Sequence, residues 1–250
     1  MIKLKKLSTA AGLASLSVLG VLASISQTSF PASANAAQVK QYVPPSNRER
    51  LQRTEGGGSR GCTNAAPVSL SLLTPKDHIA RTVSAHPTFL WHISDATSAP
   101  LVFTLTERGA NQPIFQQQLK ADRAGIMRLE VPQTAPALVE GKEYRWTVTL
   151  MCSEKRPSEN VYARAWIERV ATPSDLNQKL ASVSSDRESP SERLRQRALI
   201  YAQSGLWYDA VATLDRVRTA NPTEKQAANL FVSLLEQVGL NQVATLERQR

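Results

Sequence analysis

The longest regular alternation of apolar and polar positions in the chain runs from Leu138 to Cys152. Alternate side chains of a β-strand point to opposite faces of the sheet. One face of this segment would therefore carry Tyr144, Trp146, Val148, Leu150 and Cys152, while the other face is mostly Arg and Thr. We expect the segment to form a central strand that buries its apolar face against a second layer.

Six shorter runs of strand-like composition share the region between Cys62 and Val170, separated by Pro, Gly, Asn and Asp residues. Together with the strand at Glu143–Met151, they are predicted near Val68–Leu73, Thr88–His92, Leu101–Thr106, Ile114–Leu119, Ile126–Val131 and Val161–Glu168. Seven short strands with turn residues between them are typical of an antiparallel β-sandwich, here over residues 62–170. We expect Trp91, Trp146 and Trp166 in its core.

Beyond Arg169 the hydrophobic period changes from two to about 3.6, which predicts a helical domain over residues 171–250. Helices are expected from Pro173 to about Val183, from Ser189 to about Gln203, from about Trp207 to Thr219, and from Thr223 to Val238. Ser189 and Glu192 form a capping signal, and Gly205 ends the second helix. The predicted fold class is mainly β with an α-helical C-terminal part.

Residues 1–36 have the pattern of a secretion signal, with three lysines, an uncharged apolar core and small-residue cleavage sites up to Ala36. The apolar run is short for a membrane span, so an uncleaved anchor is the less favoured alternative. Cleavage would lower the formal net charge from +9 to +6. We expect a periplasmic or secreted protein with no membrane span after cleavage, and its mild charge does not favour nucleic-acid binding.

Residues 37–61 are rich in Gly, Pro and Arg and poor in apolar residues, which predicts a disordered basic leader. Within it, Gly57–Gly61 fits the Gly-x-Ser-x-Gly pattern of a nucleophile elbow around Ser59. That chemistry needs a strand before the serine and a helix after it, and neither flank has such a pattern. A flexible tether is the favoured interpretation.

Cys62 and Cys152 are the only cysteines. Export to an oxidising space favours a disulfide between them over two free thiols with Cys152 buried as a small apolar residue. Two cysteines cannot complete a structural zinc site. His78, His86 and His92 are expected at the surface or in turns, because no carboxylate falls at metal-ligand spacing with them. We therefore expect no metal and no other cofactor.

Two stretches resemble known modules. Pro87–Trp91 and Leu138–Tyr144 resemble the second strand and the tyrosine corner of fibronectin type III and related immunoglobulin-like domains, and the resemblance implies that the Tyr144 hydroxyl hydrogen-bonds to upstream backbone. The helical part resembles one tetratricopeptide hairpin, with matches at Leu194, Ala198, Tyr201, Gly205, Ala210, Leu214, Val217 and Pro222. A single repeat cannot bury its own faces, so the hairpin should pack on the sandwich or on a partner.

The chain as a whole resembles an uncharacterised family of secreted, mostly cyanobacterial proteins, catalogued as domain of unknown function nine-two-eight. The matching elements are Gly57–Cys62 with the Arg-rich residues before it, Pro87–Trp91, Gly141–Tyr144, Trp166–Glu168 and Tyr201–Leu214. The family has no established activity. The resemblance therefore implies a fold and an exported location, and it leaves the function open.

No set of residues forms a competent catalytic site, so we favour a non-enzymatic protein-interaction module of the cell envelope over an enzyme. Its partner would be an envelope protein. The alternative is an envelope polysaccharide binder, for which Trp207 and Tyr208 are the candidate exposed aromatic residues. A hydrolase that uses Asp122, Glu140 or Glu143 as paired carboxylates is the least favoured reading.

Overall fold

The computed structural model describes residues 41–46, 62, 68–153, 155–183 and 188–250. The predicted secretion signal and Ser59 of the predicted leader lie outside the described residues. Lys40–Arg250 form one compact unit. In the described ranges, no helix combines the length and the apolar character needed to cross a membrane.

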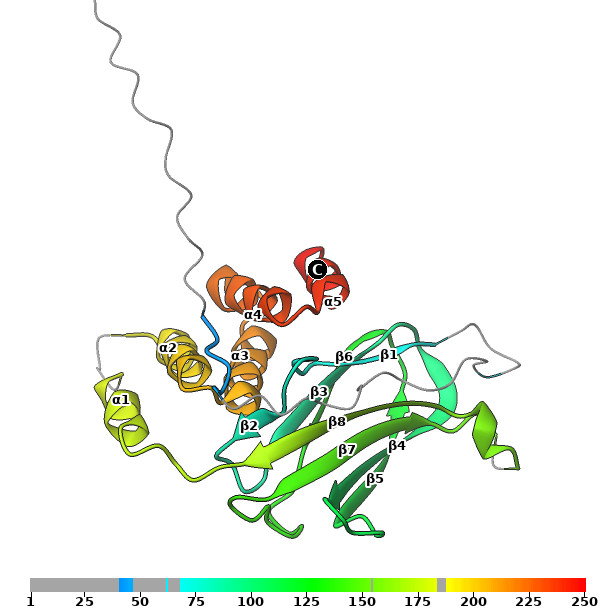
Figure 1. Ribbon diagram of the computed structural model, residues 1–250. Coiled ribbons are helices and arrows are strands. Elements are labelled where there is room, and N and C mark those ends of the chain that lie inside the picture. The colour runs from blue at the N-terminus through cyan, green and yellow to red at the C-terminus, as the bar shows by residue number, and fades with distance from the viewer. Residues whose placement is uncertain (1–40, 47–61, 63–67, 154, 184–187) are drawn as a thin grey trace, which may run out of the picture. The chain divides into compact units, whose positions relative to one another are not determined.

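Two sheets make up the first half of this unit (Figure 1). The three-stranded sheet has the order β1 (Leu70–Leu72), β3 (Thr88–Ile93), β6 (Gly125–Glu130), and its pairs are antiparallel. The five-stranded sheet has the order β2 (Ala80–Thr82), β8 (Val161–Arg169), β7 (Glu143–Leu150), β4 (Thr97–Glu107), β5 (Phe115–Ala121). Only β2 breaks the antiparallel pattern of these described strands, because it pairs in parallel with β8.

The core lies between the two sheets, and aromatic side chains fill it. Phe89 of β3 lies 4.9 Å from Trp146 of β7 and 5.0 Å from Phe103 of β4, measured between ring centroids. The inward face of β7 is buried at Tyr144, Trp146, Val148 and Leu150, and the outward side chains are only partly buried. The alternation of apolar and polar residues along β7 is therefore the physical reason for its central place.

Each of the seven predicted strands has a counterpart, but two details of the prediction are wrong. No strand was predicted at β2, because three residues are too short to show a period. Trp166 is only partly buried, because the inward face of β8 carries Ala163, Ala165 and Ile167. Both faces of β3 are buried.

Five helices follow the sheets among the described residues: α1 (Leu176–Ser182), α2 (Pro190–Gln203), α3 (Trp207–Ala220), α4 (Lys225–Gln237) and α5 (Asn241–Arg248). The Ser189 hydroxyl caps α2 by accepting a hydrogen bond of 3.1 Å from the Glu192 N–H. Gly205, with a φ of 76°, makes the turn between α2 and α3. The helix α5 was not predicted.

The helices pack directly on the sheets. The indole N–H of Trp207, at the start of α3, donates a hydrogen bond of 2.9 Å to the carbonyl of Leu73 just after β1. Of the two docking places that the sequence allowed for the helical hairpin, the structure contains the one on the sheets. The described part of the predicted leader also packs here, since Tyr42 is fully buried. The expectation of disorder is therefore wrong for residues 41–46, where an aromatic side chain fills a gap between helices and sheets.

Candidate functional site

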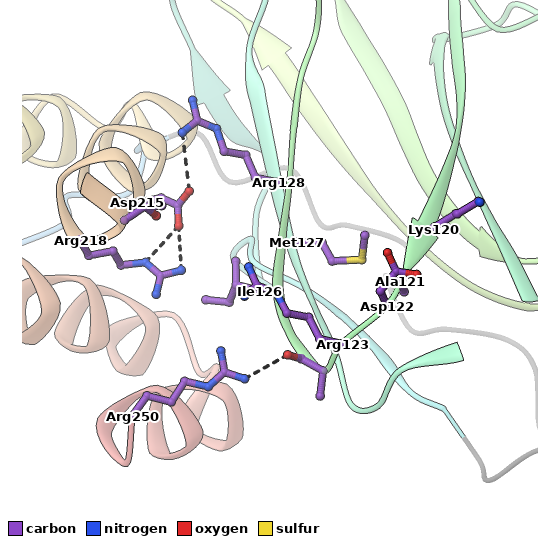
Figure 2. A pocket seen from close by; sticks show the side chains of 12 residues that line it. Lys120, Ala121, Asp122, Arg123, Ile126, Met127, Arg128, Asp215, Arg218 and Arg250 are labelled. Atoms are coloured by element: carbon purple, nitrogen blue, oxygen red, sulfur yellow. Dashed lines mark hydrogen bonds and ion pairs between the residues drawn. The ribbon is translucent and has the colours of Figure 1, made fainter. Parts of the chain in front are cut away.

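A cavity of about 650 Å³ lies between the β5–β6 connection, the helix α3 and Arg250, which follows α5 (Figure 2). Five cationic side chains line it: Lys120, Arg123, Arg128, Arg218 and Arg250. The acidic residues in its lining are Asp122 and Asp215, and Ile126 and Met127 contribute apolar surface. We call this feature the basic cavity.

The connection between β5 and β6 links the two sheets and forms one wall of the basic cavity. Gly125, the first residue of β6, has a φ of 127°, a conformation that side-chain-bearing residues rarely adopt. The Arg250 guanidinium lies 2.5 Å from the place that a Cβ of Gly125 would take. Arg250 also donates a hydrogen bond of 3.3 Å to the Ala124 carbonyl. The glycine thus lets the two walls approach each other.

An ion-pair network holds the helical wall in place. Arg218 donates to Asp215 at 3.0 and 2.7 Å and to Glu247 of α5 at 2.8 Å. Its guanidinium also lies 4.5 Å above the Phe231 ring. Because Asp215 and Glu247 are both buried, these pairs leave Arg218 with little freedom to move. Arg218 is therefore a structural part of the wall.

Lys120 and Arg123 differ from Arg218, because neither of their side chains forms an ion pair or hydrogen bond with the described residues. Both side chains are exposed and belong to the lining of the cavity. Arg128 is shared between Glu130 at 3.0 Å and the Asp215 carboxylate at 3.9 Å. An anionic group that enters the cavity would therefore meet two cations with no acidic partner and a third that is held loosely.

A polar cavity of about 260 Å³ lies between β2 and α3 and is lined by Asp209, His86, Glu130, Arg216 and other residues. The Asp209 carboxylate accepts a hydrogen bond of 3.2 Å from the Val83 N–H. Burial raises the pKa of this carboxyl from 3.8 to about 6, against the opposing effect of its hydrogen bonds. The Asp209 carboxyl therefore takes up a proton at a higher pH than an ordinary aspartate does.

His78 and His86 lie in bends between strands, which agrees with the predicted turns, whereas His92 lies within β3 and its prediction as a surface or turn residue is wrong. His78 and His92 are buried, and His86 is partly exposed. The Asp77 carboxylate lies 2.7 Å from His78 Nδ1. Burial lowers the pKa of His92. Among the residues that the structure describes, no group of three His, Cys, Asp or Glu could hold a metal ion.

The three carboxylates considered for hydrolysis do not share a site. Glu140 lies 3.4 Å from Arg169, and Glu143 lies 2.7 Å from Arg108. Asp122 lines the basic cavity, where the second acid, Asp215, is held by Arg218. The lining of the basic cavity contains no His, Ser or Cys that could act as a nucleophile or base. Its chemistry is suited to binding an anion.

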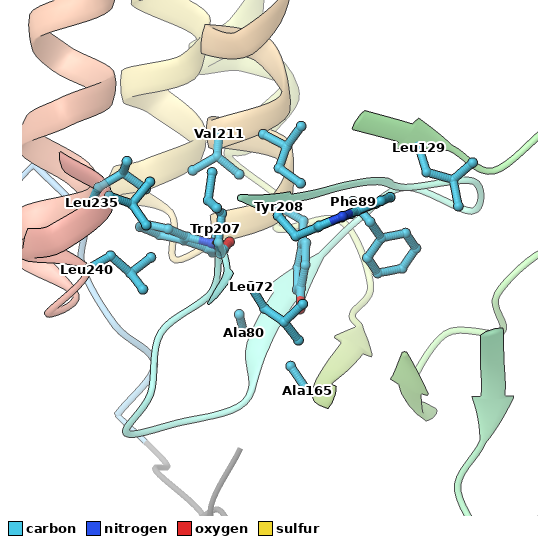
Figure 3. Close-up of a cluster of buried hydrophobic side chains, with 14 of the residues drawn as sticks. Leu72, Ala80, Phe89, Leu129, Ala165, Trp207, Tyr208, Val211, Leu235 and Leu240 are labelled. Atoms are coloured by element: carbon cyan, nitrogen blue, oxygen red, sulfur yellow. The ribbon is translucent and has the colours of Figure 1, made fainter. Parts of the chain in front are cut away.

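Trp207 and Tyr208 are buried, so their prediction as exposed aromatic residues is wrong (Figure 3). They occupy the first turn of α3 and pack among side chains of the sheets and α4. Two consecutive side chains of a helix point in different directions, so both are buried only where other parts of the fold cover two sides of the helix. Here Trp207 points toward Leu235 and Leu240, while Tyr208 points toward Phe89.

The remaining predicted residues have structural contacts. Cys62 and Cys152 form a disulfide with their Cα atoms 4.9 Å apart, which confirms that prediction. The Tyr144 hydroxyl accepts a hydrogen bond of 2.9 Å from the Val139 N–H, five residues upstream. Tyr201 is partly buried and lines the polar cavity beside Asp209. The cavity arginines were missed, because separate segments supply them and no local motif marks them.

A family model described as Domain of Unknown Function (DUF928) matches residues 55–247. The chain belongs to this family. The range matched to DUF928 includes the cavity residues from Lys120 to Thr219 and ends before Arg250. The basic cavity is thus largely built from the part of the chain that defines the family.

None of the curated proteins matches this chain. Among solved structures, it aligns with astrotactin-2, described as a conserved vertebrate-specific and perforin-like membrane protein involved in neuronal development. The alignment covers 76% of this chain and 38% of that one at 12% identity, with a TM-score of 0.23. The chain spans well under half of that protein, and a TM-score this low carries no argument about fold or function.

Proposed function

We propose that this DUF928 protein is a non-enzymatic, exported binding protein of the cell envelope, and that its basic cavity holds an acidic segment of a partner protein. The observation that carries the proposal is the cavity lining, in which Lys120 and Arg123 have no acidic partner among the described residues. Their charges are available to a ligand, whereas those of Arg218 are already used in holding the wall.

Export supports an envelope location. The predicted signal at residues 1–36 would direct the chain out of the cytoplasm. The disulfide between Cys62 and Cys152 is of a kind that persists in oxidising compartments. A periplasmic or secreted location is thus part of the proposal, together with the mostly cyanobacterial source that the family resemblance implied.

The architecture also supports a binding role. If β1, β3 and β6 are lettered A, B and E, and β4, β5, β7 and β8 are lettered C, C′, F and G, the two sheets have the orders A-B-E and C′-C-F-G, with the short β2 paired in parallel with G at the edge. This order fits the proposed immunoglobulin-like sandwich, and Tyr144 then lies near the start of F, as in a tyrosine corner. The helices α2 and α3, with Gly205 between them, fit the proposed tetratricopeptide-like hairpin. Both modules serve widely as interaction scaffolds.

The test is affinity capture from envelope extract by the mature protein at low salt. The double variant Lys120→Glu/Arg123→Glu should lose the specific partner, because its cavity lining would repel acidic groups. Lys155→Glu/Lys225→Glu is the matched control, since it changes the net charge equally at exposed positions outside the cavity. Equal capture by all three proteins, or the absence of any specific partner, would overturn the proposal.

A second candidate function, binding of an envelope polysaccharide, rests on the outer face of the five-stranded sheet. Trp166 is partly exposed there, with the Arg108 guanidinium 4.9 Å from its ring, and Arg164 lies 5.7 Å from the Tyr162 ring. Aromatic faces beside hydrogen-bond donors can bind sugar rings. Co-sedimentation with purified cell-wall polysaccharide should then be lost in Trp166→Ala and kept in Lys120→Glu/Arg123→Glu. No sedimentation of the wild-type protein would dismiss this function.

A further inference from the structure

The segment Gln41–Ser46 lies against the helices in the way that a bound peptide would. The Gln237 side chain, at the end of α4, accepts hydrogen bonds of 3.1 Å from the N–H groups of both Gln41 and Tyr42. It also donates one of 2.6 Å to the Tyr42 carbonyl. The Val43 N–H donates a further bond of 3.1 Å to the Ala202 carbonyl of α2. Side chain and helix end thus bind the backbone of an extended segment.

A closed aromatic pocket receives the Tyr42 side chain, which is 0% exposed. Its ring stacks on His78 at 5.7 Å and 15°, and meets the Trp207 ring edge-on at 5.0 Å and 72°. The Tyr42 hydroxyl lies 2.7 Å from His78 Nε2, and His78 Nδ1 lies 2.7 Å from the Asp77 carboxylate. With the Nδ1 proton donated to Asp77, Nε2 accepts from the tyrosine hydroxyl. The pocket can therefore distinguish tyrosine from phenylalanine.

Gly205 shapes the wall opposite Gln237. A Cβ at this position would lie 3.1 Å from the Val43 carbonyl oxygen, closer than almost all real contacts of this kind. The glycine thus leaves room for the backbone of the segment to pass. The same residue is needed for the turn, because its φ is 76°.

We propose that this groove, formed by α2, the start of α3, the end of α4 and His78, is a binding site for an extended tyrosine-containing peptide. In this structure the chain's own residues 41–46 occupy it, and a tyrosine-containing segment of a partner protein can take their place. Recognition has two parts, since Gln237 and Ala202 bind backbone that any sequence offers, and the His78–Trp207 pocket selects the tyrosine. The groove is separate from the basic cavity, so the two proposals stand or fall independently.

A covalently attached segment has an effective concentration in the millimolar range, which outcompetes most free peptides. The test therefore uses the full mature chain with Tyr42→Ala, in which the pocket loses its own tyrosine. The probe is a labelled peptide Gln-Tyr-Val-Pro-Pro-Ser, which copies residues 41–46. It should bind this variant one-to-one and raise its melting temperature. The same peptide with Ala or Phe in place of Tyr should bind at least about tenfold more weakly.

Two further variants test the backbone contacts. Adding Gln237→Ala to Tyr42→Ala should weaken peptide binding by about tenfold, because the amide contacts are lost. Adding Gln226→Ala, which removes an exposed amide from the same helix, should leave binding unchanged. A folded Tyr42→Ala protein that binds no peptide at about 1 mM would overturn the proposal. If Tyr42→Ala does not fold, native circular dichroism should return on refolding with the tyrosine peptide, and failure to return would overturn it equally.

Discussion

The indole N–H of Trp146 donates a hydrogen bond of 2.8 Å to the hydroxyl of Tyr208. Trp146 belongs to the central strand β7 and Tyr208 to the first turn of α3, so this bond joins the sheet core to the helices. The Tyr208 hydroxyl in turn donates to the Trp166 carbonyl at 3.1 Å and lies 3.3 Å from the Thr74 hydroxyl. Burial raises the pKa of Tyr208, which keeps the hydroxyl neutral and able to donate.

Tyr208→Phe should lower the free energy of unfolding by about 1–3 kcal/mol, because it leaves the buried Trp146 N–H without an acceptor. Urea unfolding followed by circular dichroism and by tryptophan fluorescence measures this change. Both signals should still report one transition, since helices and sheets share the junction. Tyr201→Phe is the control, because the Tyr201 hydroxyl has no hydrogen bond among the described residues. Equal loss in both variants would contradict the role of the junction.

Trp146→Ala should cost more than Tyr144→Phe. Removing the buried indole opens a large cavity, for which about 3–5 kcal/mol is typical. Tyr144→Phe removes only the bond to the Val139 N–H, which is worth about 1 kcal/mol. Equilibrium unfolding of both variants ranks the two effects. The reverse order would mean that the inward face of β7 is assigned wrongly.

Asp209 should make the protein more stable in mild acid. Its pKa is raised from 3.8 to about 6, so the folded state binds the proton more tightly than the unfolded state. The contribution is fully present below about pH 4 and is lost as the pH rises through about 6, with a difference of up to about 3 kcal/mol. Asp209→Asn should reduce the dependence of the free energy of unfolding on pH over this window. Asp175→Asn should not, because Lys179 lowers the Asp175 pKa. An unchanged slope in Asp209→Asn would contradict the prediction.

Reduction of the disulfide should lower stability by about 4–5 kcal/mol in the chain-entropy model, because the bond closes a loop with a sequence separation of 90. The matched variant Cys62→Ser/Cys152→Ser should unfold at the same urea concentration as the reduced wild type. Mass analysis under non-reducing conditions should show no free thiols in the wild-type protein. Two free thiols in the exported protein would contradict the bond.

The strands and most helices could be predicted because local signals define them. β7 alternates over its whole length, and Ser189 and Gly205 mark the limits of α2. The predictions failed where contacts between distant parts of the chain determine which side chains are buried. The local sequence around Trp207 and Tyr208 does not distinguish them from exposed residues of a helix. They are buried because other parts of the fold pack on both sides of α3. Trp166 was expected on the core face of its strand, but the small side chains of Ala163 and Ala165 fill that inward face.

The sites were harder to predict than the fold. The basic cavity combines Lys120 and Arg128 from strands with Arg218 from a helix, and no sequence spacing links them. The groove that holds Tyr42 was missed for a related reason, since the residues around Tyr42 have the composition of a disordered leader. Burial of the Tyr42 ring and the hydrogen bonds with Gln237 hold this segment in place. The residues that make these contacts lie far away in the sequence.

The most direct test of the binding function measures the affinity of the captured partner for three purified proteins. Wild type and the control Lys155→Glu/Lys225→Glu should bind with similar Kd values, and Lys120→Glu/Arg123→Glu should bind at least about tenfold more weakly. Raising the ionic strength to about 1 M should remove most of that difference, because the Debye length falls to about 3 Å. An equal Kd for all three proteins at low salt would contradict the account.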